Sequence, residues 1–204
     1  MKVKENINTN KRVASTKKYI NSLVDKYSKL NVVRVDLGYK KNEDTNKVEV
    51  TLEEANSDLD RMMNNRRSKP SIFKHNVGYI IKKEYTEDKG VHLHAVFLFD
   101  GQKVQHDIHK ATQVGEYWNQ VAHDNCGTYF NCNRKKEKYS RMGIGMIEHT
   151  DVEKRKILEE NVLHYLCKDE QSIKDMKENK QNRAFVRGSI PKTKSNAGRP
   201  RNNS

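Results

Sequence analysis

The clearest alternation of apolar and polar positions lies between residues 76 and 99, where two β-type segments flank the polar turn EDKG. Successive side chains of a strand point to opposite faces, so residues 91–99 (VHLHAVFLF) have one wholly apolar face and one face that begins with two histidines. The apolar face should pack on helices and consists of Val91, Leu93, Ala95, Phe97 and Phe99. With residues 76–86 (NVGYIIKKEYT), this segment predicts an antiparallel hairpin.

Other segments repeat their apolar residues at helical or strand spacing. Helical spacing occurs in 16–30, 52–68, 104–122 and 151–169, and the last of these is capped by Asp151. Strand-like composition occurs in 31–39, 48–52 and 144–148, whereas residues 1–14 are polar and predict loose chain. We therefore expect an α+β fold with a central antiparallel sheet, helices packed on one face, and a metal site with the helix that carries Tyr165 on the other.

Composition divides the chain into three parts. Residues 1–30 form an N-terminal arm and helix, residues 31–170 the main domain, and residues 171–204 a basic tail. The tail has nine Lys and Arg against two acids and few residues that could form a core, which predicts disorder. No P-loop motif occurs, so a replication function would draw on a host helicase as partner.

The charge balance favours a nucleic acid partner over other classes. The 204 residues carry a formal net charge of +13, and contacts between such cations and phosphates release counterions. Three cysteines with no CxxC pair do not make a disulfide framework. No apolar run approaches membrane-spanning length, so we expect a cytoplasmic protein with no membrane partner and no small-molecule cofactor.

His92 and His94 are candidate metal ligands, because imidazoles at i and i+2 share a strand face. Glu84 would join them if the hairpin loop has an odd number of residues centred on Asp88, since Glu84 then pairs with His92. An even loop would put Glu84 on the opposite face. Two imidazoles and one carboxylate leave coordination positions open, and this mixed set suits Mn²⁺ or Mg²⁺, although zinc or iron could occupy it.

Tyr165 and Lys168 stand three residues apart on a predicted helix and are surface neighbours there. A tyrosine with an ordinary pKa of about 10 is a poor nucleophile at neutral pH. A neighbouring ammonium lowers that pKa or neutralises charge on an attacked phosphate. The pair is a candidate nucleophile with its assisting cation.

Basic residues outside this group are candidate DNA contacts. Arg34 shares a strand face with Asp36, where a solvated surface pair is an equal alternative. Residues 134–141 form a basic loop, and residues 198–201 (GRPR) resemble the core of an AT-hook, which places arginines in a narrow minor groove. The predicted DNA contacts are Arg34, Arg134, Lys135, Lys136, Lys138, Arg141, Arg199 and Arg201.

The combination of these motifs resembles the HUH endonucleases, which include rolling-circle replication initiators, relaxases and single-strand transposases. The order RVDLGY, GYIIKKE, GVHLHAVFLF, EYWNQV, YLCK and GRPR looks most like the inovirus-type replication proteins of phages and prophages, over residues 31–201. One departure is the single candidate nucleophile, because position 169 is Asp and position 161 is Asn.

The resemblance implies a palm-like sheet and a nicking reaction at a replication origin. Tyr165 would attack a phosphodiester of single-stranded DNA to give a 5′-phosphotyrosine and a free 3′-OH. Glu84, His92 and His94 would hold the divalent metal, and Lys168 would assist at the phosphate. Three alternatives stay open: a non-catalytic DNA-binding regulator, a single-strand transposase, and an iron oxygenase, whose metal site also has two histidines and a carboxylate.

Overall fold

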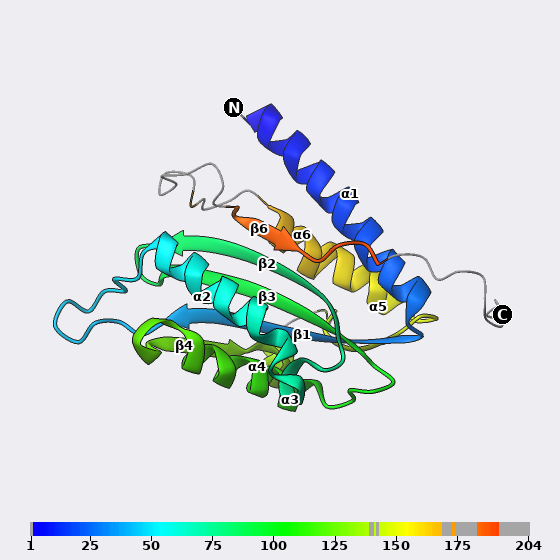
Figure 1. Cartoon of the computed structure of the whole chain (residues 1–204). Helices are drawn as coiled ribbons and strands as arrows, with labels where there is room; N and C mark the ends of the chain where they lie inside the picture. The colour runs from blue at the N-terminus through cyan, green and yellow to red at the C-terminus, as the bar shows by residue number, and fades with distance from the viewer. Residues whose placement is uncertain (1, 139–140, 142, 169–172, 174–182, 192–204) are drawn as a thin grey trace.

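The computed structural model describes residues 2–138, 141, 143–168, 173 and 183–191 (Figure 1). It shows a six-stranded antiparallel sheet with flanking helices, so the predicted α+β class is confirmed. The strand order is β4-β1-β3-β2-β6, and β5 pairs with the other end of β1. The strands are β1 (Lys29–Tyr39), β2 (Asn76–Thr86), β3 (Gly90–Asp100), β4 (Gly127–Asn131), β5 (Gly145–Glu148) and β6 (Phe185–Arg187).

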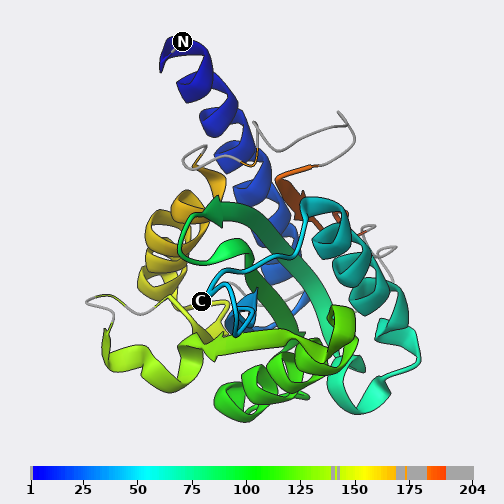
Figure 2. The same ribbon diagram turned by 90° about the vertical axis from the view of Figure 1, so that its left-hand side faces the viewer.

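Helices cover both faces of the sheet (Figure 2). One layer contains α2 (Leu52–Asn64), α3 (Pro70–Phe73) and α4 (Asp107–Val121). The other layer contains α1 (Lys2–Lys26) and a helix in three parts: α5 (Val152–Ile157), a π-helical turn (Leu158–Leu163) and α6 (His164–Cys167). Three 3-10 helices complete the described elements: Asn65–Arg67, His123–Asn125 and Cys132–Lys138. None of the helices in these described ranges is long and apolar enough to cross a membrane.

The alternation along β3 assigns its two faces as the sequence predicted. The apolar face, from Val91 to Phe99, packs with α2, α3 and α4 in one core cluster. Val96 and Leu98, on the other face, pack with α1 and with the helix that carries Leu163 and Leu166. Burial of apolar side chains on both faces provides the main driving force for the fold.

Two predictions for the N-terminal half are wrong. Residues 2–14 belong to α1 and are not loose, because the helix also gains tertiary contacts: the Arg12 guanidinium donates to the Cys167 carbonyl at 3.0 Å. Residues 48–52 do not form a strand. Thr51 and Glu54 instead make a capping box that starts α2, and local side-chain to backbone hydrogen bonds of this kind compete with strand pairing.

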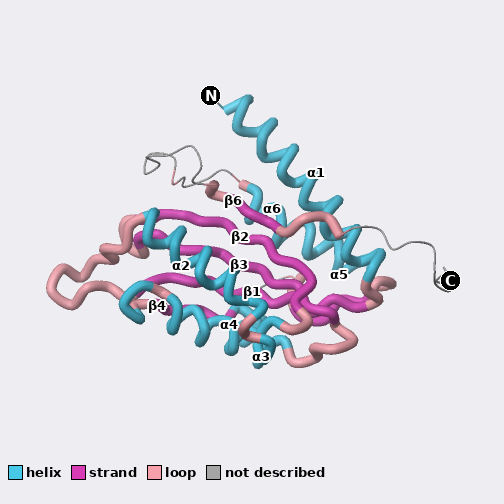
Figure 3. The backbone as a smooth tube through the Cα atoms, viewed as in Figure 1, coloured by secondary structure: helices cyan, strands magenta, loops and turns pink. Residues whose placement is uncertain are grey.

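Two strands lie where the sequence predicted none. β4 lies just before the segment interpreted as a basic loop (residues 134–141) and pairs with β1. β6 lies in the tail that was predicted to be disordered, which is wrong for residues 183–191; it pairs with β2 on the side away from β3 (Figure 3). Ile173 is also buried in the core, so residue 170 does not end the packed domain. Arg199, Arg201 and the GRPR motif lie outside the described residues.

Candidate metal centre

The β2–β3 hairpin has the register on which the metal prediction depended. Thr86 pairs with Gly90, so the loop has three residues centred on Asp88, and Glu84 lies directly opposite His92. Gly90 adopts a φ of 60°, where a side chain would be strained, and its Cβ would lie 2.6 Å from the Val48 side chain. A glycine at this position therefore makes the loop, and with it the register, possible.

Glu84, His92 and His94 form a buried group that could bind a metal ion. Their potential ligand atoms all lie within 4.8 Å of one another. The three residues are 4%, 7% and 7% exposed, respectively. The Glu84 Oε2 atom lies 3.0 Å from His94 Nε2 and 3.7 Å from His92 Nε2. The prediction that these three residues converge on one point is confirmed.

Hydrogen bonds at the far side of each imidazole fix the rings for metal binding. His92 Nδ1 lies 3.0 Å from the Gly90 carbonyl oxygen, and His94 Nδ1 lies 2.7 Å from Asp36 Oδ1. A carbonyl and a carboxylate can only accept, so each Nδ1 carries a proton and donates it. A protonated ring can then donate from Nε2 to the Glu84 carboxylate, whereas a neutral ring has its Nε2 lone pair available for a cation at the same position. Carboxylate and carbonyl partners of this kind are typical of metal-binding histidines, so the donor set fits a divalent cation.

Lys82 is a buried cation in this group that the sequence analysis missed. It is 4% exposed, lies opposite His94 in the hairpin, and its ammonium contacts Glu84 Oε1. Burial alone would raise the pKa of Glu84, but hydrogen bonds from His92, His94 and Lys82 hold that pKa well below its usual range. The signal was present in the sequence, because Lys82 stands two residues before Glu84 on the same face.

Tyr165 lies beside the metal-ligand group. Its hydroxyl is 3.2 Å from His94 Nε2 and 3.4 Å from Glu84 Oε2, and the side chain is 37% exposed. The Arg34 guanidinium and the Lys82 ammonium lie 5.5 Å and 5.3 Å from the centroid of its ring. Burial, and then the charge of Glu84, raise the pKa of Tyr165 to about 12. The phenol is thus protonated at neutral pH.

The helix that carries Tyr165 has a π-helical turn immediately before α6. Asp151 caps its start by accepting from the Lys154 N–H, as predicted. Gly143 lies against the π-helical turn, where a Cβ would be 2.6 Å from the Leu158 backbone. π-Helical turns are rare and occur frequently at functional sites. Here the turn ends two residues before Tyr165, whose hydroxyl lies 3.2 Å from His94 Nε2.

The remaining predicted residues differ in their surroundings. Arg34 lies at the site, whereas Lys136 pairs with Asp107 at 2.5 Å and Arg141 with Glu160 at 3.9 Å. Lys168 follows α6 as its C-cap, and Arg134 and Lys135 are exposed on the 3-10 helix Cys132–Lys138. The side chain of Lys138 lies outside the described residues.

Asp36 also belongs to the site as the partner of His94, a role that the sequence did not reveal. Its carboxylate is partly buried beside the imidazole, which would raise its pKa, yet hydrogen bonding and charge from His94 lower that pKa. Burial lowers the pKa of His94, and the hydrogen bonds to Asp36 and Glu84 outweigh that effect and raise it. Asp36 thus holds the imidazole in one orientation and tautomer.

Fold and site together define an α+β protein with a buried Glu-His-His group that could bind a metal ion. The sequence profile of the YagK/YfjJ C-terminal domain family matches residues 1–188, and the chain belongs to that family. No curated protein and no solved structure matches the chain.

Proposed function

We propose that this protein is a metal-dependent endonuclease that nicks single-stranded DNA with Tyr165 as nucleophile. Its role would be to start rolling-circle replication of a phage or mobile element. The observation that carries the proposal is the position of the Tyr165 hydroxyl, 3.2 Å from His94 Nε2 and 3.4 Å from Glu84 Oε2. The proposal is supported because the candidate nucleophile lies beside candidate metal ligands that are 71 and 81 positions away in the sequence.

Glu84, His92 and His94 would hold Mn²⁺ or Mg²⁺ and leave coordination positions open for a phosphate oxygen. When bound, the cation supplies positive charge that stabilises the charge developing on the phosphoryl group. His94 keeps its Nε2 directed at the ligand position because Asp36 accepts from its Nδ1. The Gly90 carbonyl orients His92 in the same way, because it accepts from the His92 Nδ1.

The reaction transfers a phosphoryl group between two oxygens and needs no redox partner. The phenol of Tyr165 loses its proton, and a bond forms between its oxygen and the phosphorus. The bond from phosphorus to the 3′ oxygen breaks, and that oxygen takes up a proton. The products are a 5′-phosphotyrosine on the protein and a free 3′-OH on the DNA.

Lys82 and Arg34 would contribute charge next to the reacting atoms. Each cation lies within 5.5 Å of the Tyr165 ring centroid, so each favours the phenolate over the phenol and attracts a phosphate. Two carboxylates, Glu84 and Asp36, balance these two cations before metal binds. A divalent cation would therefore leave the site with a net positive charge suited to a phosphodiester.

The decisive experiment is a covalent-adduct assay. The protein is mixed with Mn²⁺ and labelled single-stranded DNA from the origin region of its own element, and the products are separated on a denaturing gel. We expect a labelled adduct that disappears in Tyr165→Phe and on addition of chelator. An adduct that persists in Tyr165→Phe would exclude Tyr165 as the nucleophile.

Tyr85→Phe is a matched control, because Tyr85 is exposed to the same degree but lies outside the metal-ligand group. It should retain the adduct. If the wild-type protein binds this DNA and forms no adduct, the chain is a DNA-binding regulator and the nuclease proposal is wrong. Calorimetric titration with Mn²⁺ tests the metal separately, and His92→Ala should abolish the binding signal.

A further inference from the structure

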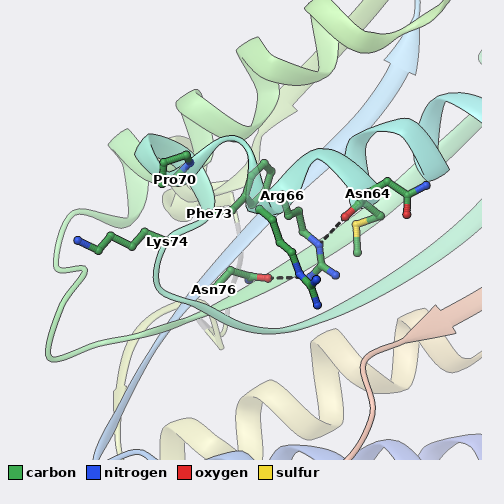
Figure 4. A pocket seen from close by; sticks show the side chains of 8 residues that line it. Asn64, Arg66, Pro70, Phe73, Lys74 and Asn76 are labelled. Atoms are coloured by element: carbon green, nitrogen blue, oxygen red, sulfur yellow. Dashed lines mark hydrogen bonds between the residues drawn. The ribbon is translucent and has the colours of Figure 1, made fainter.

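Two cavities with basic walls lie at the edge of the sheet that β2 and β6 form. The first, about 660 Å³, lies between the end of α2, α3 and the start of β2. It is lined by Arg66, Arg67, Lys74 and the side-chain amides of Asn64 and Asn76, and no acidic side chain is among its lining residues (Figure 4). We name it the α2–α3 cavity. The lining residues that the structure describes thus carry positive charge and no carboxylate.

Arg66 is fixed in this cavity by neutral partners. Its guanidinium donates to the Met63 carbonyl at 3.0 Å and to Asn76 Oδ1 at 3.2 Å, and lies 4.8 Å from the Tyr79 ring centroid. The Asn76 amide is held in turn by donating to the Gly78 and Leu98 carbonyls at a β-bulge. A cation held in this way keeps its charge for a ligand and loses little entropy on binding.

The second cavity, about 370 Å³, lies between α1 and β6, and we name it the α1–β6 cavity. Its described walls include Arg12, Arg183 and Arg187, with the hydroxyl of Ser15 and the ring of Phe185, and none of the lining residues that the structure describes is acidic. The Arg187 guanidinium donates to Ser15 Oγ at 2.7 Å and to the Gly188 carbonyl at 2.9 Å. These acceptors are also neutral.

The two cavities are neighbours across the edge of β2. The Tyr79 N–H donates to the Tyr19 hydroxyl at 3.1 Å, and the Gly188 N–H donates to the Tyr79 carbonyl at 3.0 Å. Arg66 lies over the Tyr79 ring, and Arg187 lies 5.2 Å from the Tyr19 ring centroid. A Cβ at Gly188 would be 2.3 Å from the Tyr19 hydroxyl, so glycine allows this close contact.

The α1–β6 cavity also adjoins the candidate metal centre. Phe185 pairs with Lys82 on the neighbouring strand, and paired residues point to the same face of a sheet. Lys82 contacts both Glu84 and the Tyr165 ring. From the other side, Arg12 donates to the carbonyl of Cys167, two residues after Tyr165. A series of cations therefore runs from Arg66 through Arg187 to Lys82 and the nucleophile.

We infer that this β2–β6 edge binds the backbone of the single DNA strand whose scissile phosphate reaches Tyr165. The inference rests on the proposed function and adds the path of the substrate. Guanidinium groups suit repeated phosphates, and the Arg12 guanidinium is positioned 5.4 Å from the centroid of the partly buried Phe185 ring. A flexible strand can follow two cavities around a sheet edge, whereas a free phosphate would occupy one of them.

The test measures binding without chemistry. Full-length Tyr165→Phe protein is titrated in chelator against a fluorescent single-stranded oligonucleotide at several salt concentrations. The variant Arg67→Gln/Arg183→Gln removes one exposed cation from each cavity. We expect about tenfold weaker binding at 0.1 M salt. The salt slope, which is the slope of the logarithm of affinity against the logarithm of salt concentration, should fall in magnitude by about 1.4, because each of two lost single-strand contacts contributes about 0.7.

Matched control variants distinguish the loss of positive charge at this edge from the loss of positive charge elsewhere on the surface. Lys103→Gln/Lys156→Gln removes two exposed lysines from other elements and should change the slope by less than half as much. Arg67→Lys/Arg183→Lys keeps both charges and should keep the slope. Equal slopes for Arg67→Gln/Arg183→Gln, the edge variant, and for the Lys103/Lys156 control would overturn the inference. So would duplex DNA that competes as well as single-stranded DNA, or displacement of the oligonucleotide by millimolar inorganic phosphate.

Failure of this inference is distinguishable from failure of the proposed function. If wild-type protein forms the Tyr165 adduct while the edge variant binds normally, the substrate follows another path and the inference is wrong. If the edge variant loses affinity as expected and no adduct forms, the edge stands as a DNA-binding surface and the nuclease proposal is wrong. Circular dichroism melting verifies that each variant is folded.

Discussion

Strand β3 presents two different faces to the two helical layers. Toward α2 and α4 its side chains are all apolar and fully buried. Toward α1 and α6 the strand changes along its length, from Val96 and Leu98 in the core to His92 and His94 in the candidate metal centre. Both faces are buried, but only the first is stabilised by burial alone.

The difference between the two faces shows that a buried ionisable side chain requires a partner of complementary charge or hydrogen-bonding capacity. At the polar end, each ionisable side chain has a partner: Lys82 contacts Glu84, and His94 bonds to both Glu84 and Asp36. Removing charges from water costs free energy that such partners offset only in part. We therefore expect the apolar face to determine stability and the polar face to determine metal binding and chemistry.

The largest expected effect is on the apolar face. Phe97 is fully buried, and its ring lies 5.9 Å from that of Phe73, so Phe97→Ala should reduce the free energy of unfolding by about 3–5 kcal/mol. Urea unfolding followed by circular dichroism measures this change. Phe97→Leu is the control and should lose clearly less, because it fills more of the site. A loss below about 1 kcal/mol for the alanine variant would contradict the assignment of stability to this face.

A smaller effect should come from the polar face and appear in metal binding. Asp36→Asn keeps the size of the side chain but weakens the acceptor of the His94 Nδ1 proton, so Mn²⁺ affinity should fall about 10- to 100-fold. Titration calorimetry measures the affinity, and the free energy of unfolding should change less than in Phe97→Ala. Asp60→Asn, on the exposed side of α2, is the matched control. Equal affinities for the two variants would show that Asp36 does not support the site.

The smallest effects should come from helix caps, one in each layer. Thr51 caps α2 and Asp151 caps α5, and replacing either by Ala should cost about 1 kcal/mol. Asp151→Ala should also reduce the initial rate of Tyr165 adduct formation, because α5 continues through the π-helical turn into α6. Thr51→Ala should leave that rate unchanged. A slower rate in Thr51→Ala alone would reverse the expected division between the layers.

Much of the site was predictable because its parts are short-range. Strand periodicity places His92 and His94 on one face, and the turn residues EDKG indicate the hairpin between them and Glu84. The length of its loop stayed open in the sequence, and the structure fixed it at three residues. The partners from other strands were not predictable in the same way. Asp36 reaches His94 only because β1 pairs with β3 in a register that the separate segments do not specify.

The sequence by itself determined the apolar face of β3, the helical segments around it, the hairpin, and the residue types suited to metal and phosphate. Local periodicity and turn chemistry are sufficient for these features. Only the tertiary structure decided that β6, from a segment with the composition of a solvated tail, pairs with β2 beside Lys82. It also decided that Tyr165 lies within 3.4 Å of Glu84, although the two residues are 81 positions apart. Such contacts depend on the summed packing of both layers, which no local pattern encodes.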